Sequence, residues 1–354
     1  MAQGDVVTES ESGADLAGVA DSCLLNELDF TDLYLSETGA AHMRGLSDSS
    51  DPLYGVPDGV IGDLEEVRNK VCNIGQLERE FVLDYDGVRY RVTRMQGQTT
   101  LTYHLRRAMF PIPRIRDLGI HPAVVQALGR LGHPGGSAIQ RGSGLILVAG
   151  ATGQGKTTTL CSLLQEYLIS YGDIAVTIED PPELKLEGEH GKFGLCYQFT
   201  VKNGDFSSLV REALRQNPRY IMLGEIRDSA SAHQVLTAAM SGHVVLATIH
   251  GGSVEEALVR ITKYVASETD TDLARSMLAD SISAVLYQEM KKIVTKDGSG
   301  RVKRVVSISS LFFGRDSDSK GLRQKVRDGK IPQLSTDIEL QRNKMDKGKP
   351  PIGA

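Results

Sequence analysis

The stretch of sequence that decides the fold runs from Gly144 to Thr159 and reads GLILVAGATGQGKTTT. Its first part is a short apolar run, about the length of a buried parallel strand, and its last part opens a helical pattern. Between them, Gly150–Thr157 matches the pattern G-x4-G-K-[ST], whose glycines let backbone N–H groups close around phosphate oxygens. A helix that begins directly after such a loop adds the positive end of its dipole. The stretch therefore predicts a strand, a phosphate-binding loop and a helix.

The residue types of this loop point to a bound nucleotide. Lys156 is expected to reach the β- and γ-phosphates of ATP, and the Thr157 hydroxyl is expected to ligand Mg²⁺. The plain alternative is a glycine-rich turn with an idle lysine, which the strand before the loop and the helix after it disfavour. The candidate nucleotide-binding residues are Gly150, Ala151, Thr152, Gly153, Gln154, Gly155, Lys156, Thr157 and Thr158.

Around and beyond the loop, short apolar runs alternate with helical stretches. The predicted strands are Leu145–Val148, Ala175–Ile178, Tyr220–Leu223 and Val244–Ala247. The predicted helices between them include Thr157–Ile169, Phe206–Gln216 and Ala230–Met240. Alternation of this kind is typical of an α/β domain with a mostly parallel sheet.

Polar residues follow the later strands of this series at the point where each strand ends. Glu179 and Asp180 come directly after the second strand, Glu225 follows the third after one glycine, and His250 follows the fourth by three residues. The carboxyl ends of parallel strands lie along one edge of a sheet, and ligands bind in the crevice outside that edge. These residues and the loop are therefore expected to converge on one site.

The chemistry of phosphoryl transfer assigns roles to these residues. A carboxylate beside the γ-phosphate can orient or deprotonate the attacking water, and a second can hold Mg²⁺ directly or through water. Glu179 is the candidate for the first role, with Asp180 and Glu183 as neighbours, and Glu225 for the second. His250 is the candidate for sensing the γ-phosphate or passing its presence to an adjacent subunit. Taken singly, each has a plain alternative, a solvated strand-end charge or a structural histidine.

The sequence before residue 109 has a different pattern. In Arg79–Val92, apolar and polar residues alternate around Asp86-Gly87, which predicts a hairpin. Further strands are expected at Asp32–Leu35 and Thr99–His104. This part of the chain therefore predicts a small α+β domain.

The domain boundaries follow from changes in composition. The N-terminus is small, polar and acidic, which predicts disorder. Pro111 and Pro113 favour an extended interdomain segment. The expected division is a disordered tail at residues 1–20, an α+β domain at 21–108, a linker at 109–120 and the phosphate-loop domain at 121–354.

Arginines cluster ahead of the expected linker, at Arg89, Arg91, Arg94, Arg106 and Arg107. On strand-like segments most of them are expected to be solvated. The alternative is that some act as arginine fingers, which reach the γ-phosphate in a neighbouring subunit.

The composition narrows the class of protein. The 354 residues are 40% hydrophobic and 24% charged, the balance of a soluble globular chain of about two domains. The net charge of -5 gives no bulk basic field, so no direct nucleic-acid binding is expected. The four cysteines form no C-x-x-C pair, so neither a zinc site nor a disulfide framework is predicted. No signal peptide pattern or membrane-spanning apolar run is present, so we expect a cytoplasmic protein without membrane insertion.

Together these segments resemble the PilT-like secretion ATPases, a family that includes pilus retraction motors and the TraJ- and DotB-type ATPases of conjugation and type IVB secretion. The chain lacks the four-cysteine zinc insert of many assembly-type members, and Gly321–Asp328 only loosely follows the A-I-R-N-L-I-R-E motif of retraction motors. These departures favour the conjugation and secretion branch. The matching segments are Phe30–Ser36, Gly144–Thr159, Thr177–Glu183 (TIEDPPE), Leu214–Asp228 (which contains GEIRD), Ser241–His243, Thr248–His250, Leu278–Gln288 and Val326–Gln333.

The resemblance implies more than the residues do. It implies a RecA-like ATPase domain after a PAS-like N-terminal domain, in a homohexameric ring with nucleotide at the seam between subunits. It implies Glu179 as the catalytic glutamate and Glu225 as the Walker-B glutamate. It also implies arginine fingers around Arg91, Arg94 and Arg106, supplied within the two-domain unit or across it, and of these Arg94 and Arg106 are taken as the catalytic candidates. The ring is implied to use ATP and Mg²⁺ and to dock from the cytoplasm on inner-membrane platform or secretion-channel proteins.

The expected function is therefore an ATP-hydrolysing motor of a conjugation, type IV secretion or pilus machine. The alternative enzyme is a type IV pilus retraction ATPase. A nucleotide-gated ring scaffold with slow hydrolysis is a further alternative, which two candidate catalytic carboxylates disfavour. A RecA-like DNA helicase is also considered, and the acidic net charge and the absence of tryptophan give it little support.

Overall fold

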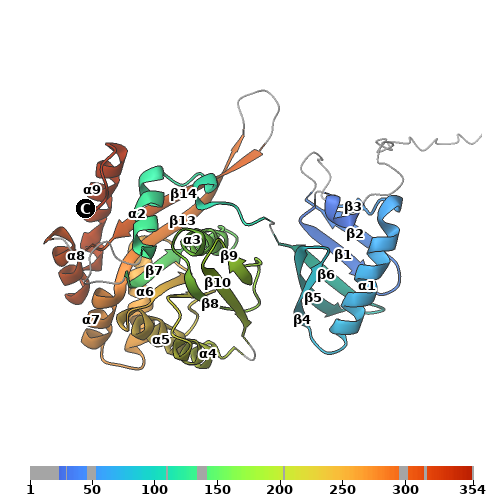
Figure 1. Ribbon diagram of the computed structural model, residues 1–354, viewed down its shortest axis with the longest axis horizontal. Coiled ribbons are helices and arrows are strands. Elements are labelled where there is room, and N and C mark those ends of the chain that lie inside the picture. The colour runs from blue at the N-terminus through green and yellow to red at the C-terminus, as the bar shows by residue number, and fades with distance from the viewer. Residues whose placement is uncertain are drawn as a thin grey trace, which may run out of the picture. The chain divides into compact units, whose positions relative to one another are not determined.

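The chain divides into two compact units, and the boundary falls between Arg107 and Ala108. Figure 1 shows that each unit has a sheet of its own. The predicted N-terminal tail, residues 1–20, lies outside the described residues. The computed structural model describes residues 24–28, 30–45, 53–108, 111–133, 142–201, 204–294, 302–314 and 317–352.

The first unit is an antiparallel sheet covered by one helix, α1 (Ile61–Gly75). The predicted hairpin is β4 and β5, and its turn residues Asp86 and Gly87 have φ of 46° and 75°, which the tight connection requires. Leu33 and Leu35 point to the helix and are buried, as their alternation with polar neighbours predicts. Within the sheet the strands lie in the order β3-β2-β1-β6-β5-β4. Along the chain they are β1 (Asp32–Ser36), β2 (Ala41–Arg44), β3 (Tyr54–Gly55), β4 (Glu80–Tyr85), β5 (Val88–Gln96) and β6 (Leu101–Arg107).

The second unit is built on a larger sheet in the order β14-β13-β7-β12-β11-β8-β10-β9. The strands from β13 to β10 are parallel, and only the two outer pairs are antiparallel. The four predicted runs lie within β7, β8, β11 and β12, so the predicted α/β class with a mostly parallel sheet is confirmed. The strands are β7 (Gly144–Ala149), β8 (Asp173–Glu179), β9 (Gly188–His190), β10 (Gly194–Thr200), β11 (Tyr220–Leu223), β12 (Val244–Ile249), β13 (Ile282–Val294) and β14 (Val302–Phe312).

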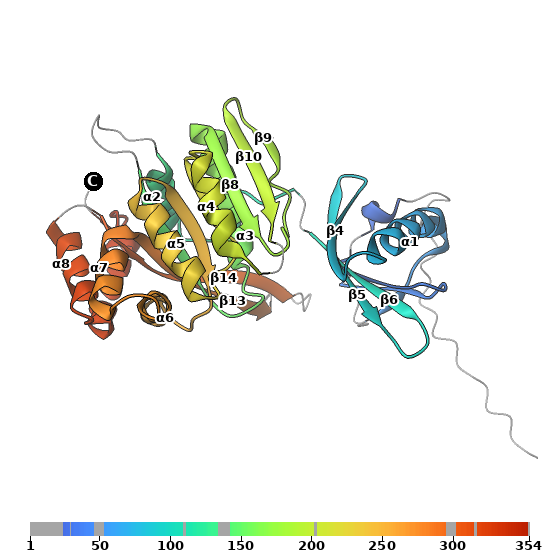
Figure 2. The same cartoon turned by 90° about the horizontal axis from the view of Figure 1, so that it is seen from below.

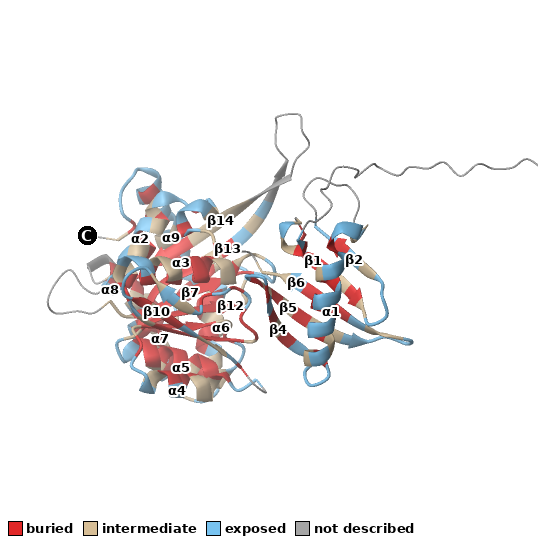
Figure 3. Cartoon of the chain, turned by 45° about the vertical axis from the view of Figure 1, so that its right-hand side comes forward, coloured by how far each residue is buried: buried red, intermediate tan, exposed pale blue. Residues whose placement is uncertain are grey.

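Helices cover both faces of this sheet, as Figures 1 and 2 show. Residues of β7 alternate between two cores: Leu145 and Leu147 pack with α4 to α8, whereas Ile146 and Val148 pack with α2 and α3. Figure 3 shows the resulting band of buried strands. None of the helices in the described ranges is long and apolar enough to cross a bilayer. The helices are α2 (Pro122–Gly132), α3 (Lys156–Tyr171), α4 (Phe206–Arg215), α5 (Ser229–Met240), α6 (Val254–Ala266), α7 (Thr271–Ser281), α8 (Ser317–Arg327) and α9 (Leu334–Asp346).

The segment expected as a linker, residues 109–120, is anchored in the second unit by three buried isoleucines. Ile112, Ile115 and Ile120 are at most 6% exposed and join the core beneath α2 and α3. From Ile112 on, the segment is therefore part of the core of the second unit. Residues 109 and 110 lie outside the described ranges.

The helix that starts at the phosphate loop is fixed from behind by α2. The Tyr167 hydroxyl of α3 donates a hydrogen bond of 2.6 Å to the Leu128 carbonyl, and its ring stacks on Tyr220 with centroids 5.5 Å apart. Gly132 leaves room for this ring, because a Cβ built there would lie 2.3 Å from two ring carbons. A glycine is therefore required where α2 crosses α3.

We predict that Gly132→Ala lowers the free energy of unfolding by about 1–3 kcal/mol, because a fully buried ring must move to admit the methyl group. Gly129→Ala is the matched control in the same helix, since nothing lies within 4 Å of its built Cβ. The control is expected to be neutral or to stabilise by up to about 1 kcal/mol through helix propensity. Urea unfolding of the full chain measures both, and equal stability of the two variants would contradict the packing described here.

Candidate active site

The loop between β7 and α3 has the backbone that its glycines predict. Gly153 and Gly155 both have φ of 75°, a left-handed conformation that side chains disfavour. Nothing lies within 4 Å of a Cβ built at Gly153, so the conformation and not crowding calls for glycine there. Gly155 caps α3 without any side-chain bond to the first-turn N–H groups. These N–H groups are therefore available to an anion at the helix N-terminus.

Lys156 is held inside the loop. Its Nζ donates to the Gly150 carbonyl at 2.9 Å and to the Ala151 carbonyl at 2.8 Å, and the residue is only 8% exposed. Burial lowers the pKa of the amine, and the charges of Glu225 and Glu183 partly oppose that shift. The ammonium group therefore lies against the start of the loop, whose residues 151–153 are exposed.

The loop is braced from β13 by a residue to which the sequence assigned no role. Gln288 is 1% exposed, and its Nε2 donates to the Gln154 carbonyl at 2.6 Å while its Oε1 accepts from the Thr159 hydroxyl at 2.7 Å. The Met290 N–H donates to Oε1 of Gln154 at 2.5 Å. Backbone and side chain of the loop are thus both tied to β13. The partners are 129 to 136 positions apart, so no local pattern indicates the contact.

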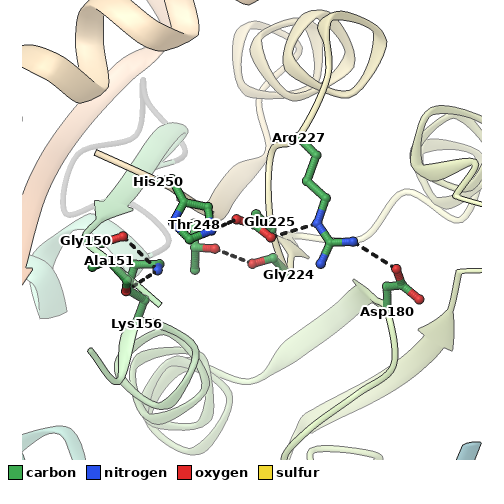
Figure 4. Close-up of polar contacts among 9 residues, drawn as sticks. All are labelled: Gly150, Ala151, Lys156, Asp180, Gly224, Glu225, Arg227, Thr248 and His250. Atoms are coloured by element: carbon green, nitrogen blue, oxygen red, sulfur yellow. Dashed lines mark hydrogen bonds and ion pairs between the residues drawn. The ribbon is translucent and has the colours of Figure 1, made fainter. Parts of the chain in front are cut away.

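Three strand ends meet in one polar network, shown in Figure 4. Nε2 of His250, after β12, lies 2.7 Å from Oε1 of Glu225, after β11. The other Glu225 oxygen accepts from Nε of Arg227 at 2.7 Å, and Nη1 of Arg227 reaches Asp180, after β8, at 3.0 Å. The Thr248 hydroxyl also donates to the Gly224 carbonyl. The structure therefore brings His250, Glu225 and Asp180 together, as the sequence predicted for the strand ends.

Arg227 is the member of the network that the sequence analysis did not single out. Its hydrogen bond to Glu225 raises the pKa of the guanidinium further, so the group is charged at every pH of interest. It places one positive charge between the two carboxylates of Glu225 and Asp180. The only available signal was its place in the GEIRD segment, and the sequence does not say which acid it pairs with.

Glu179 lies apart from this network, in a buried setting. It is 1% exposed, and its Oε1 accepts hydrogen bonds from the Thr177 hydroxyl at 2.7 Å and from Nε2 of Gln198 at 3.1 Å. Glu225 has an 18% exposed side chain, and Glu183 is exposed. The two principal candidate carboxylates therefore differ in environment: Glu179 is buried and bonded to Thr177 and Gln198, whereas Glu225 is partly exposed and paired with Arg227.

The arrangement fits a magnesium nucleotide. Thr157 and Thr158 are half-buried in the first turn of α3, beside the open N–H groups. The Thr157 hydroxyl and the Glu225 carboxylate are oxygen donors, the kind that Mg²⁺ takes in small number beside phosphate oxygens and water. These two residues would hold the ion, and the loop would hold the phosphates.

The candidate arginine fingers differ in what they contact within the first unit. Arg94 donates from Nη1 to the Gly75 carbonyl, at the last residue of α1. Arg106 has a 70% exposed side chain and lies 3.7 Å from the Asp32 carboxylate. Arg94 is thus placed to cap a helix, whereas the Arg106 guanidinium faces solvent.

We predict that Arg94→Ala loosens the C-terminal turn of α1, because loss of a charged hydrogen bond costs about 1.5–3 kcal/mol. Hydrogen exchange of the full chain, followed by mass spectrometry, should show faster exchange in α1. Arg106→Ala is the control and should leave exchange there unchanged, since its side chain is 70% exposed and its contact is with Asp32 of β1 rather than with α1. Unchanged exchange in the Arg94 variant would argue against a capping role.

Curated proteins of bacterial transport are similar to this chain. The protein transport protein HofB homolog of Escherichia coli is 31% identical over 237 residues, which cover 65% of this chain and 46% of that protein. The type IV pilus retractation ATPase PilT of Pseudomonas aeruginosa is 36% identical over 200 residues, 55% of this chain and 53% of that protein. The chain spans about half the length of the curated relatives that it matches.

Solved structures share the fold. The pilus retraction motor PilT with bound ADP superposes with a TM-score of 0.70 at 24% identity, covering 89% of this chain and 87% of that one. The ATPase DotB of Legionella pneumophila gives 0.66 at 20% identity, covering 92% and 90%. The likeness extends over both units, so the predicted class, an α/β domain preceded by a small α+β domain, is confirmed.

The family comparison covers the candidate site as a whole. The family described as "Type II/IV secretion system protein" matches residues 96–329, which is more than half of the chain. This span contains the phosphate loop, the buried Glu179 and all three strand ends of the polar network. The chain belongs to the type II/IV secretion system protein family.

Proposed function

We propose that this protein hydrolyses ATP to drive a bacterial conjugation, type IV secretion or pilus machine. The observation that carries the proposal is the meeting of the phosphate loop with the polar groups of three strand ends at one sheet edge. Family membership and the named relatives support the link to a transport machine.

In the proposed mechanism, the first-turn N–H groups of α3 and the glycine loop bind the phosphates. Lys156 exchanges its two carbonyl partners for β- and γ-phosphate oxygens, which costs little because the amine is already in place. When bound with the nucleotide, Mg²⁺ offsets phosphate charge, and Thr157 and Glu225 are the residues that would hold it.

Glu179 is the proposed water-activating residue. Its carboxylate is buried and accepts hydrogen bonds from Thr177 and Gln198, whereas the Glu225 carboxylate is paired with the Arg227 guanidinium. His250 contacts Glu225 directly, so displacement of Glu225 on nucleotide binding would reach His250. This contact supports the proposed role of His250 as a sensor of the γ-phosphate.

Two alternatives stay open on specific grounds. A retraction ATPase is suggested by the similarity to PilT, and the loose C-terminal motif in Gly321–Asp328 favours a secretion or conjugation machine instead. A slow, nucleotide-gated scaffold has no use for a water-activating carboxylate, so the buried Glu179 argues for the enzyme.

We further propose that the chain works as a homohexamer. In such a ring, an arginine of the first unit would complete a nucleotide site of a neighbouring subunit. Arg106 is favoured over Arg94 for this role because its guanidinium is exposed. The ring would dock from the cytoplasm on inner-membrane platform or secretion-channel proteins.

Two variants should distinguish ATP binding from ATP hydrolysis. Glu179→Gln is expected to bind ATP with a dissociation constant within about threefold of wild type and to lose at least ~10²-fold in kcat, because the proton acceptor is gone. Lys156→Ala is expected to lose binding itself. Fluorescent-nucleotide titration and phosphate release measure the two steps. Wild-type turnover in Glu179→Gln would move the water-activating role to another carboxylate.

Assembly can be tested without knowing the partner machine. Sedimentation velocity of the full chain with Mg²⁺ and a non-hydrolysable ATP analogue should show a hexamer, because each nucleotide is proposed to bind at a subunit seam. Arg106→Ala should assemble but turn over ATP at least ~10³-fold more slowly, the usual effect of losing a finger. A monomer under all nucleotide conditions would count against the ring.

A further inference from the structure

The amide of Gln198 links the proposed water-activating residue to a neighbouring strand. Gln198 lies on β10 level with Thr177 of β8, in the parallel pairing of these strands. Its Nε2 donates to Oε1 of Glu179 at 3.1 Å, and the Thr177 hydroxyl donates to the same oxygen at 2.7 Å. Two donors from two strands thus converge on one carboxylate oxygen and fix its place.

The orientation of the Gln198 amide is set by its other partners. Oε1 accepts from the N–H groups of Leu186 and Glu187 at 2.7 and 2.8 Å, and Nε2 also donates to the Leu184 carbonyl at 2.9 Å. A flipped amide would face two N–H donors with its own NH₂ group and a carbonyl with its oxygen. The amide therefore has a single favourable orientation, and that orientation directs an N–H group at Glu179.

The same contacts close a loop around the acidic segment. Residues 180–183 connect Glu179 to Leu184, and Gln198 is bonded to both of these ends. Backbone also encloses the carboxylate from the side of β11, since a Cβ built at Gly224 would lie 3.4 Å from Cγ of Glu179. Glu179, the last residue of β8, is therefore surrounded by the Gln198 amide and by the backbone at Gly224.

We propose that Gln198 is a positioning residue for hydrolysis, which holds the Glu179 carboxylate in line for the attacking water. The proposal rests on the role of Glu179 proposed above. A general base must stay within hydrogen-bond reach of its water, and small misplacements of reacting groups cost up to roughly 10²-fold in rate. Gln198 touches no phosphate-binding group in these contacts, so it acts on the chemical step and not on nucleotide affinity.

Two substitutions at Gln198 separate positioning from simple support of the fold. Gln198→Met keeps the length of the side chain and removes every hydrogen bond of the side-chain amide. Gln198→Glu keeps the acceptor for Leu186 and Glu187 but replaces the donor to Glu179 and to the Leu184 carbonyl with a second negative charge. If the residue only supported the loop, the glutamate would be the milder change. Positioning of a carboxylate makes the glutamate the more harmful one.

The experiment measures ATP affinity and kcat of the full-length variants at pH 7.5, with Gln216→Met, an exposed position at the end of α4, as control. We expect dissociation constants within about threefold of wild type in all of them. Turnover should fall roughly 10- to 100-fold in Gln198→Met and about tenfold further in Gln198→Glu. The control should turn over at the wild-type rate.

A second route to the same contact covers the case in which a Gln198 variant does not fold. Thr177→Val is isosteric and removes only the other donor to Oε1 of Glu179, so kcat should fall severalfold with affinity unchanged. Wild-type kcat in Thr177→Val and Gln198→Met would overturn the positioning role, as would a glutamate variant more active than the methionine variant. If Glu179→Gln itself turned over normally, the proposed function of Glu179 would fail first, and the two failures are distinguishable.

Discussion

The parallel hydrogen bonding of β7, β12, β11 and β8 is the constraint on which the site depends. The register pairs Gly144 with Val244 and Tyr220 with both Val244 and Ala175, so these strands point the same way and end at one edge. Each carries its functional group just past that edge. The parallel pairing of the strands thus brings together the phosphate loop, the buried carboxylate and the polar network.

The site then divides its electrostatics into two environments. Glu225 forms an ion pair with Arg227 through one carboxylate oxygen and contacts the His250 ring through the other. Glu179 is buried, and Thr177 and Gln198 donate hydrogen bonds to one of its carboxylate oxygens. One environment suits an ion and a sensor, and the other suits a base. Glu179 and Glu225, which the sequence does not distinguish, therefore lie in different chemical environments.

The brace behind the phosphate loop connects this site to the far part of the sheet. Gln288 hydrogen-bonds to the loop backbone and to the first turn of α3, and it lies on β13, whose partner β14 ends the sheet.

The two candidate arginine fingers of the first unit differ in their contacts. Arg94, on β5, donates to the last residue of α1, whereas Arg106 has an exposed guanidinium.

The sequence by itself determined the loop, the strands of the parallel sheet and the convergence of strand ends, because these depend on local apolar runs, glycine conformation and a general property of parallel sheets. Glu225, His250 and Asp180 were found in this way. Only the tertiary structure decided that Arg227 bridges two acids, that Gln198 holds Glu179 and that Gln288 braces the loop. The reason is physical: a side-chain hydrogen bond between strands depends on their register and on which face each residue takes. Both are fixed by packing between segments that the sequence keeps far apart.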